Sequence, residues 1–383
     1  MNYIYQTTNI FEAIHFNVPV VFECYANIIK CFCYHDTATD WQQTIKWHSQ
    51  RHPRPVYCFM DVREISHPII FDRWGPSHLV HLPFTWNNLG VDPKQILFLG
   101  NQHSIVDHKT VQYLLGLEIH TEWIRYFEAD CVFRHTVQES FDNRQGPNHQ
   151  TLHTLMSHDK KYLAMFGKPR KFMRAGALIK MSQMNMIDDS VVGCLVSHQG
   201  IDQVVKSCEY WPEHELRPIL EKYSGSADNI EYDSPHTDNS NYRGYPYDPS
   251  LYKDTALSIV AETNDVKIPG VEQSTAFWIT EKICRAMYNY HPFVVLSTPK
   301  FLQNLKSYGY KTFNSIVDES YDEMIDPYRR LQTALESAQD LYDNYTSTLI
   351  KDIVVHNHQQ LHRVYIQTIE RLFSSLNHIS SIK

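Results

Sequence analysis

The stretch Tyr162-Leu163-Ala164-Met165-Phe166-Gly167-Lys168-Pro169-Arg170-Lys171 consists of an apolar run followed by a basic turn. A helical pattern then extends over residues 172–184, and a second apolar run covers residues 191–197. Short apolar runs bounded by turn residues are typical of buried parallel strands, and a helix between two of them makes a βαβ unit. This part of the chain therefore predicts a parallel sheet, whose ligands bind outside the carboxyl ends of its strands.

A similar alternation precedes this unit. Apolar runs at residues 56–60 and 96–100 predict two buried parallel strands, and a helical pattern runs over about residues 109–127. The polar residues 138–159 contain an Asn-Arg-Gln-Gly-Pro-Asn segment, which is typical of a linker. The first part of the chain is therefore predicted to be a separate α/β domain.

The alternation also continues downstream. We predict a strand at residues 256–262, a helix at about 280–290 and a strand at 292–297. Residues 224–254 are rich in Ser, Asp, Asn, Tyr and Pro, and they are too numerous for an ordinary connection. We expect this segment to be a surface insertion, either a mobile lid or a partly disordered one.

The last seventy residues read as helices. Ser320-Tyr321-Asp322-Glu323 has the spacing of a capping box, and Asp326-Pro327 places a capping acid before a first-turn proline. His356, His358 and His362 are the nearest approach to a histidine cluster, but they lie in a polar helical segment. We therefore expect these three side chains to be exposed to solvent.

Composition limits the classes of protein that fit. The chain has 383 residues, which suits two domains of roughly 150 to 200 residues. It is 43% hydrophobic and 20% charged, the balance of a folded soluble protein. No run approaches the roughly 20 apolar residues of a membrane helix, and the eight cysteines form no CxxC pair. We expect a cytoplasmic protein, in the host cytoplasm if the chain is viral.

The formal charge of −8 does not indicate strong affinity for nucleic acid, although a local basic groove is compatible with it. The segment with the best ligand-binding pattern is Thr280-Glu281-Lys282, with Arg285 one turn later. A helix that begins at the carboxyl edge of a parallel sheet offers free N–H groups and a positive dipole end to a phosphate. Lys282 and Arg285 add positive charge, and Glu281 is suited to accept hydrogen bonds from ribose hydroxyls.

Three segments in order resemble the donor-binding half of the α1,3-fucosyltransferases. They are Leu257-Ser258-Ile259-Val260-Ala261-Glu262-Thr263-Asn264, Phe277-Trp278-Ile279-Thr280-Glu281-Lys282 and His291-Pro292-Phe293-Val294-Val295. The resemblance implies that Lys282 binds the donor pyrophosphate, Glu281 the ribose, and Glu262 the donor sugar or nucleotide. The Glu-Asn-Ser signature of that family is Glu262-Thr263-Asn264 here, which leaves the sugar and the nucleobase open.

The resemblance also extends to the basic turn, because that family has an arginine at the head of the helix after a strand. Arg170 and Arg174 both occupy this place, and a guanidinium group grips phosphate oxygens in a bidentate way. The sequence does not choose between them. A second resemblance, to uncharacterised glycosyltransferase-like proteins of phages and marine bacteria, covers residues 161–383 and includes Asp318-Glu319-Ser320-Tyr321-Asp322.

Candidate general bases follow the first two predicted strands. Asp61 and Asp107 are the preferred candidates for deprotonating an acceptor hydroxyl, with Glu64 and His103 as alternatives. No Asp-x-Asp triad is present, so we expect no metal and no cofactor besides the sugar-nucleotide co-substrate. Cationic side chains and a helix dipole would take the place of the metal.

The sequence therefore predicts an α/β protein of GT-B-like class, with two Rossmann-like domains facing each other and C-terminal helices. The predicted parts are an acceptor-side domain at 1–150, a donor-binding domain at 151–345 and a C-terminal helix at 346–383. The predicted activity is inverting, metal-independent transfer of a hexosyl, fucosyl or pentosyl group from a nucleoside-diphosphate sugar to a glycan or small hydroxyl acceptor. One alternative is a phage enzyme acting on a hydroxymethylated base in DNA, and another is a non-catalytic nucleotide-sugar or protein-binding module. The oligomeric state stays open.

Overall fold

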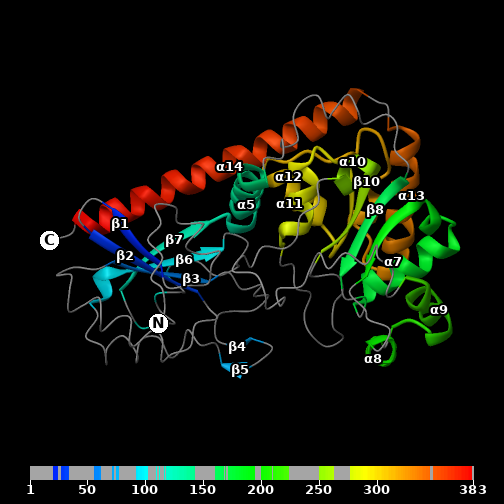
Figure 1. Ribbon diagram of the computed structural model, residues 1–383, viewed down its shortest axis with the longest axis horizontal. Coiled ribbons are helices and arrows are strands. Elements are labelled where there is room, and N and C mark those ends of the chain that lie inside the picture. The colour runs from blue at the N-terminus through cyan, green and yellow to red at the C-terminus, as the bar shows by residue number, and fades with distance from the viewer. Residues whose placement is uncertain are drawn as a thin grey trace. The chain divides into compact units, whose positions relative to one another are not determined.

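The chain forms two compact units in the computed structural model (Figure 1). The first holds the described residues up to Asp130 and those from Val364 onward, and the second holds those from Cys131 to Arg363. Each is built around a sheet of mostly or wholly parallel strands with helices, which confirms the α/β class with C-terminal helices. The structure describes residues 20–24, 27–33, 56–61, 71–72, 75–76, 92–101, 109, 112, 116, 118–142, 160–167, 169, 171–194, 200–208, 210–223, 250–262, 277–345 and 348–381.

The sheet of the first unit has the order β1-β2-β3-β6-β7. Only the β1 and β2 pair is antiparallel, and the other neighbours are parallel. The strands predicted at 56–60 and 96–100 are confirmed as β3 and β6. The elements of this unit are β1 (Val20–Cys24), β2 (Asn27–Cys33), β3 (Val56–Asp61), β4 (Phe71–Asp72), β5 (Gly75–Pro76), η2 (Pro93–Gln95), β6 (Ile96–Asn101) and β7 (His120–Ile124).

The helix predicted at 109–127 is wrong over its last part. Residues 120–124 form strand β7, and the helix that follows is α5 (Tyr126–Asp142). A Cβ atom at Gly100 would lie 1.4 Å from the Trp123 ring, so the glycine in β6 leaves the room that this ring fills in the neighbouring strand. Local periodicity cannot show such a contact between strands. Helix α5 also includes residues 138–142 of the predicted linker, and residues 143–159 lie outside the described part of the chain.

The sheet of the second unit is wholly parallel and has the order β11-β10-β8-β9. All four of its strands were predicted, as were the two helices that follow β8 and β10. Their inward residues are almost all apolar and buried, which is why the pattern was readable. The elements are β8 (Lys160–Gly167), α7 (Phe172–Gln183), β9 (Ser190–Cys194), β10 (Thr255–Ala261), α11 (Glu281–Tyr288) and β11 (Phe293–Leu296).

The direction of the chain reverses between β8 and β10. After β8 it crosses through α7 to β9 on one side, and after β10 it crosses through α11 to β11 on the other side. Right-handed crossovers in opposite directions place the two helices on opposite faces of the sheet, and Figure 1 shows α11 on the other side of the sheet from α7 and α13. The carboxyl ends of β8 and β10 therefore form a topological switch point, where ligands of open parallel sheets bind.

The remaining helices cover this sheet or continue to the C-terminus. The helical C-terminal region is confirmed by α13 and α14. Residues 250–254 of the predicted insertion form α10, whereas 224–249 lie outside the described residues. The elements are η3 (Ile187–Asp189), α8 (Ile201–Ser207), α9 (Glu213–Tyr223), α10 (Ser250–Asp254), α12 (Phe301–Ser307), η5 (Ser320–Asp322), α13 (Pro327–Asp343) and α14 (Thr348–Ser381).

One of the two predicted helix starts is confirmed. The Asp326 carboxylate accepts hydrogen bonds from the N–H groups of Tyr328 at 2.8 Å and Arg329 at 3.2 Å, with Pro327 as the first residue of α13. The capping box at Ser320 is wrong, because this residue begins the short 3-10 turn η5. The N–H and hydroxyl groups of Ser320 donate to Asp318 instead, at 2.8 and 2.9 Å.

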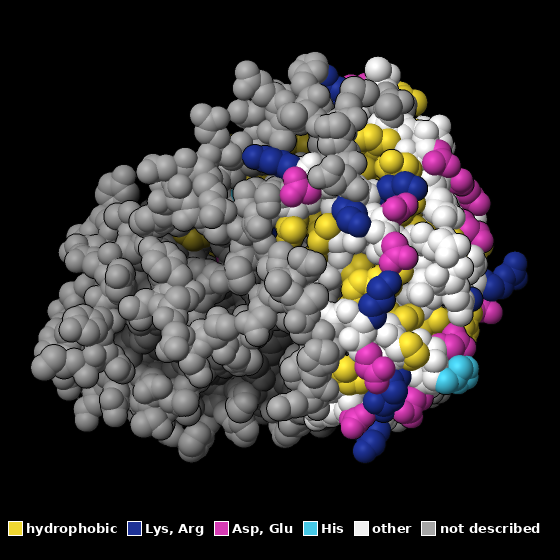
Figure 2. All heavy atoms as spheres, turned by 45° about the vertical axis from the view of Figure 1, so that its right-hand side comes forward, with side chains coloured by type: hydrophobic (Ala, Val, Ile, Leu, Met, Phe, Trp, Pro, Cys, Tyr) yellow, Lys and Arg dark blue, Asp and Glu magenta, His cyan; other side chains and the backbone are white. Residues whose placement is uncertain are grey.

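The described surface carries charges of both signs. Figure 2 shows Lys and Arg side chains beside Asp and Glu side chains across the coloured part of this face. Ion pairs of the second unit include Lys161 with Asp189 at 2.8 Å and Lys222 with Asp188 at 2.8 Å. Solvent and salt screen such exposed pairs, so they add little to stability. Within the described residues, no helix has the length and apolar character that would let it cross a membrane.

Candidate functional site

The candidate site lies at the switch point of the second sheet. Strand β8 ends at Gly167, whose φ of +58° lies in the left-handed region that glycine adopts at little cost. Strand β10 pairs Ser258 with Leu163, and continuing this register brings Glu262 level with Gly167. The segments that lead into α7 and α11 therefore leave the sheet from the same edge.

Glu262 and Thr280 join the end of β10 to the start of α11. The Thr280 hydroxyl donates to Glu262 Oε2 at 2.5 Å, and the Thr280 N–H donates a longer hydrogen bond to Oε1 at 3.4 Å. Both residues are fully buried. A hydrogen bond to a carboxylate is among the stronger ones in proteins, and burial strengthens it further.

Thr280 is also the N-cap of α11. Its backbone is extended, with φ −112° and ψ 177°, and its hydroxyl oxygen accepts from the Lys282 N–H at 3.3 Å. The single hydrogen of the Thr280 hydroxyl is donated to Glu262, and the oxygen of the same hydroxyl accepts from Lys282. The predicted start of the helix is therefore confirmed, and Thr280 ties it to the sheet.

Glu281 and Lys282 form a close pair in the first turn of α11. The Lys282 ammonium donates to Glu281 Oε1 at 2.5 Å, and the side chains are 13% and 20% exposed for lysine and glutamate. Burial opposes ionisation of Glu281, but the charges of Lys282 and Arg285 outweigh it and lower its pKa to about 2. The carboxylate is therefore ionised at neutral pH and can only accept hydrogen bonds.

For Glu262, burial outweighs the nearby positive charge. It raises the pKa of Glu262 to about 7, against the smaller influences of the Lys282 charge and the Thr280 hydrogen bond. The pKa values of the two glutamates differ because Lys282 pairs directly with Glu281, with Arg285 adding positive charge, whereas burial dominates for Glu262. Arg285 lies one turn after Glu281, and the positive charges of Arg285 and Lys282 both act on that carboxylate.

Arg174 lies in the first turn of α7, and it is 8% exposed. Its Nε has no hydrogen-bond partner among the described residues. The helix N-cap, Lys171, makes no capping hydrogen bond through its side chain. The start of α7 follows the carboxyl end of β8, so Arg174 belongs to the turn of the helix nearest that edge of the sheet.

The other predicted site residues are described only in part. Asp61 is the last residue of β3, level with Gly100 of β6, so it lies at the carboxyl edge of the first sheet. Arg170 and Asp107 lie outside the described residues. Their roles stay predictions.

Trp278 belongs to the segment that carries the fucosyltransferase resemblance, but its burial was not predicted. It is 2% exposed, and its Nε1 has no hydrogen-bond partner in the described part of the chain. Phe277 and Ile279 on either side are also buried, so the segment that enters α11 is embedded in the unit. The only sequence signal is that a bulky apolar run immediately precedes the helix cap.

The prediction that His356, His358 and His362 are exposed to solvent is wrong, because all three are half-buried. His356 lies against the Gly309 carbonyl oxygen, at 2.9 Å, and His358 and His362 pack at the C-terminal end of α11. The His358 Nδ1 lies 2.7 Å from the Tyr288 carbonyl oxygen, and the His358 ring stacks on Tyr290 with centroids 4.0 Å apart. Burial lowers the pKa of His362, whose ring stacks on Tyr288. Packing of α14 on the end of α11 accounts for the difference. Among the described residues, no group of three or more His, Cys, Asp or Glu is placed to hold a metal ion.

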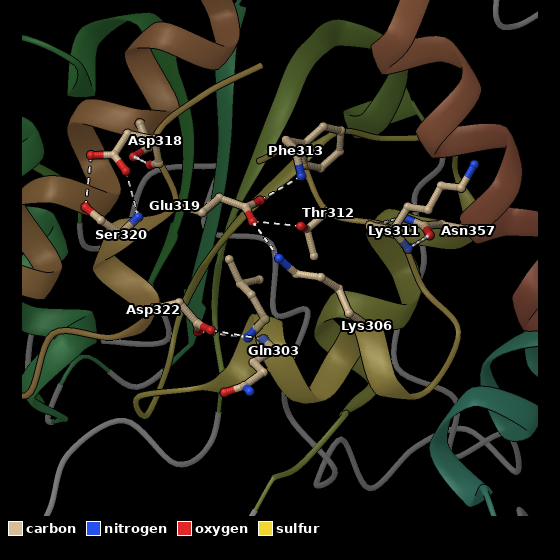
Figure 3. A network of polar contacts seen from close by, with 12 residues as sticks. Gln303, Lys306, Lys311, Thr312, Phe313, Asp318, Glu319, Ser320, Asp322 and Asn357 are labelled. Carbon is tan, nitrogen blue, oxygen red and sulfur yellow. Dashed lines mark hydrogen bonds and ion pairs between the residues drawn. The ribbon is translucent and has the colours of Figure 1, made fainter. Parts of the chain in front are cut away.

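The segment Asp318-Glu319-Ser320-Tyr321-Asp322, which carries the second resemblance, supports neighbouring elements (Figure 3). Asp322 accepts from the N–H groups of Leu302 and Gln303 at the start of α12, at 2.8 and 3.0 Å. Glu319 accepts from the Thr312 hydroxyl at 2.7 Å and from the Phe313 N–H at 2.6 Å. These carboxylates hold backbone segments in place.

No family model matches the sequence, and no curated protein matches it. Among solved structures, the fold is similar to UDP-forming α,α-trehalose-phosphate synthases from Burkholderia vietnamiensis and Burkholderia xenovorans. The TM-scores are 0.44 and 0.43 with 10% identity to each, and the matches cover 90% of this chain and 77% and 79% of those chains. An α,α-trehalose 6-phosphate synthase from Burkholderia multivorans gives a TM-score of 0.41 with 9% identity, covering 90% of this chain and 77% of that one. Similarity at this level describes the path of the backbone and does not identify a ligand.

Proposed function

We propose that this protein is a GT-B-type glycosyltransferase that moves a sugar from a nucleoside-diphosphate sugar to the hydroxyl of a glycan or a small compound. The observation that carries the proposal is the start of α11. There, the ion pair of Glu281 and Lys282 follows a cap that is hydrogen-bonded to the end of β10. This arrangement lies at the switch point of a parallel sheet, where such folds bind ligands.

Each charged group has a part in the proposed donor site. Lys282 and Arg285 bind the diphosphate, and Arg174 approaches it from the start of α7, with Arg170 as a further candidate. The Arg174 Nε is buried and has no hydrogen-bond partner among the described residues, which is costly, and a phosphate would supply an acceptor. Glu281 stays ionised and accepts hydrogen bonds from the ribose diol.

The same groups account for the chemistry. When the bond between the sugar and the diphosphate breaks, negative charge grows on the leaving diphosphate oxygen. Fixed cations and helix N-termini stabilise that charge, so the transfer proceeds without a metal. We assign the role of general base to Asp61 or Asp107, whose carboxylate accepts the proton of the acceptor hydroxyl as it attacks from the opposite side of the sugar ring, which inverts the anomeric centre.

The test is donor binding by Lys282→Ala. Thermal unfolding of the full chain is recorded with GDP-, UDP-, dTDP- and ADP-sugars, and the dissociation constant of the stabilising donor is then measured by calorimetry. Loss of the charge-assisted contact should weaken binding by at least about tenfold. Lys351→Ala removes an exposed lysine of α14 and serves as the matched control. A Lys282→Ala variant that binds every donor as well as the parent would refute the proposal.

A further inference from the structure

The carboxylate of Glu262 is enclosed at the end of β10. Its backbone N–H donates to the Leu296 carbonyl oxygen of β11 at 3.1 Å, so its main chain continues the sheet. The residue is 0% exposed, and its carboxylate reaches sideways to Thr280. Glu262 is thus fixed on one side by a neighbouring strand and on the other by the cap of α11.

Thr280 passes this constraint to the residues that follow it. Its hydroxyl oxygen accepts from the Lys282 N–H at 3.3 Å, and its carbonyl oxygen accepts from the Cys284 N–H at 3.3 Å. The position of Thr280 therefore sets the first turn of α11, including the Cα of Lys282. The chain of contacts runs from the sheet through Glu262 and Thr280 to the proposed phosphate-binding lysine.

We propose that Glu262 is a positioning residue that sets the place of Lys282 through Thr280, and that neither Glu262 nor the Thr280 hydroxyl contacts the donor. This inference rests on the proposed function and differs from the fucosyltransferase resemblance, which places Glu262 against the sugar or nucleotide. Zero exposure of Glu262 and commitment of the Thr280 hydrogen to it favour the indirect role. Displacement of the Lys282 ammonium by about 1 Å would be enough to weaken its binding to a diphosphate.

The raised pKa of Glu262 agrees with this role. Enclosure by protein disfavours the ionised form of a carboxyl group, and the hydrogen bonds from Thr280 partly compensate Glu262 for its burial. A carboxylate that binds the ribose or the sugar must be accessible to the ligand. Glu281, which is partly exposed, meets this condition, whereas Glu262 does not.

A double-mutant cycle tests whether Glu262 acts on Lys282 through Thr280, a chain of contacts that we call the relay. The dissociation constant of the donor is measured for the parent, Glu262→Gln, Thr280→Val and the double variant, all as full chains. We expect each single variant to weaken binding by at least about fivefold and the double variant to equal Thr280→Val alone. Direct contact predicts that Glu262→Gln weakens binding by the same factor in both backgrounds, and that result would overturn the inference. An unchanged dissociation constant in Glu262→Gln would overturn it as well.

Thr280→Ser supplies a control for misfolding, because it keeps the hydroxyl and loses only a methyl group. It should bind the donor within about twofold of the parent if the hydroxyl carries the relay. A Thr280→Ser variant that is as weak as Thr280→Val would contradict the proposal. Kinetic constants add a second readout, since displacement of a binding lysine raises KM for the donor more than a purely catalytic loss would.

The relay can also be read without any donor. Hydrogen exchange of the Lys282 amide, which donates to Thr280, should quicken in both Glu262→Gln and Thr280→Val and stay slow in Thr280→Ser. If the amide of Lys282 is equally protected in all variants, the relay is absent. This measurement separates the two proposals: quickened exchange with no donor binding by the parent would support the relay and refute the donor site.

Discussion

At the scale of single residues, two buried charged groups at the carboxyl edge of the second sheet have different surroundings. Glu262 has a hydroxyl and an N–H donor, whereas the Nε of Arg174 has no partner among the described residues. The first arrangement is complete in the protein alone. The second would be completed by an anionic ligand, so the two residues should respond differently to substitution.

Glu262 should make stability depend on pH. Its pKa rises from 4.5 to about 7 on folding, so the folded chain holds a proton that the unfolded chain has lost. The unfolding free energy should therefore fall as pH increases from about 4.5 to about 7, by roughly 3 kcal/mol, and level off above that range. Urea unfolding of the parent and Glu262→Gln across pH 4.5 to 8 would measure the difference. Glu221→Gln is an exposed control, and parallel curves for parent and Glu262→Gln would contradict this expectation.

Arg174→Met should separate stability from binding. Methionine keeps the buried length of the side chain and removes a charge that has incomplete hydrogen bonding. We expect the unfolding free energy without ligand to stay within about 1 kcal/mol of the parent or to rise, while donor affinity falls by at least about tenfold. Urea unfolding and calorimetric titration give the two quantities. Unchanged donor affinity would remove Arg174 from the site.

At the scale of elements, α12 depends on a distant carboxylate. Its N-cap, Lys300, has a φ of +66°, a conformation that is strained for a residue other than glycine. Asp322 holds this start through its carbonyl oxygen, which accepts from the Lys300 N–H at 2.6 Å, and through its carboxylate. The three oxygen atoms of Asp322 thus accept from N–H groups at the start of α12, which has no hydrogen bond from a capping side chain of its own.

Asp322→Ala should therefore destabilise the second unit. The N–H of Leu302 is buried and would lose its acceptor, so we expect a loss of about 2 kcal/mol in the unfolding free energy. Asp318→Ala removes an exposed carboxylate of the same segment and should cost less than about 1 kcal/mol. Chemical denaturation of the two variants gives the comparison, and equal losses would show that burial of the acceptor is not what matters.

The elements also show what could be read from sequence. Strands β8, β10 and β11 were predicted because they are apolar runs flanked by turn residues, and α13 was predicted because Asp326 acts on its immediate neighbours. Strand β7 was missed because His120–Ile124 mixes polar and apolar residues and depends on the space above Gly100.

Contacts within the candidate site were less predictable. Lys282 and Glu281 are neighbours in sequence, so their pairing needed only the correct helix. The contact between Glu262 and Thr280 joins the end of β10 to the cap of α11, and the two residues are 18 positions apart in sequence. Spacing indicates that both are polar residues near strand and helix ends, but only the fold brings them together.

At the scale of the whole molecule, the boundaries between the two compact units lie inside helices and not in polar linker segments. The compact units part within α5, after Asp130, and within α14, after Arg363, because each of these long helices contributes to both units. The boundary predicted at 150 rests on the polar segment 138–159, and both this boundary and that at 345 stay predictions. Each unit has a parallel sheet with a carboxyl edge, and the charged residues of the candidate site lie at this edge in the second unit.

Donor binding should therefore protect one unit more than the other. With a saturating nucleoside-diphosphate sugar, hydrogen exchange should slow most in peptides that contain the starts of α7 and α11. Peptides of β1 and β2 should change least, because the charged groups of the proposed site belong to the second unit. Mass spectrometry of the full chain measures this pattern. Uniform slowing across both units, or slowing confined to the first, would contradict it.

The link between Glu262 and Thr280 has a consequence for how chains of this kind can diversify. Hydrogen bonds hold Glu262 and Thr280 together at the sheet edge, so the first turn of α11 should keep its place whatever number of residues separates the two in sequence. Doubling the length of a flexible loop costs only about 0.6 kcal/mol in closure entropy. We therefore expect insertions between Glu262 and Thr280 to cost little stability and to leave the start of α11 in place.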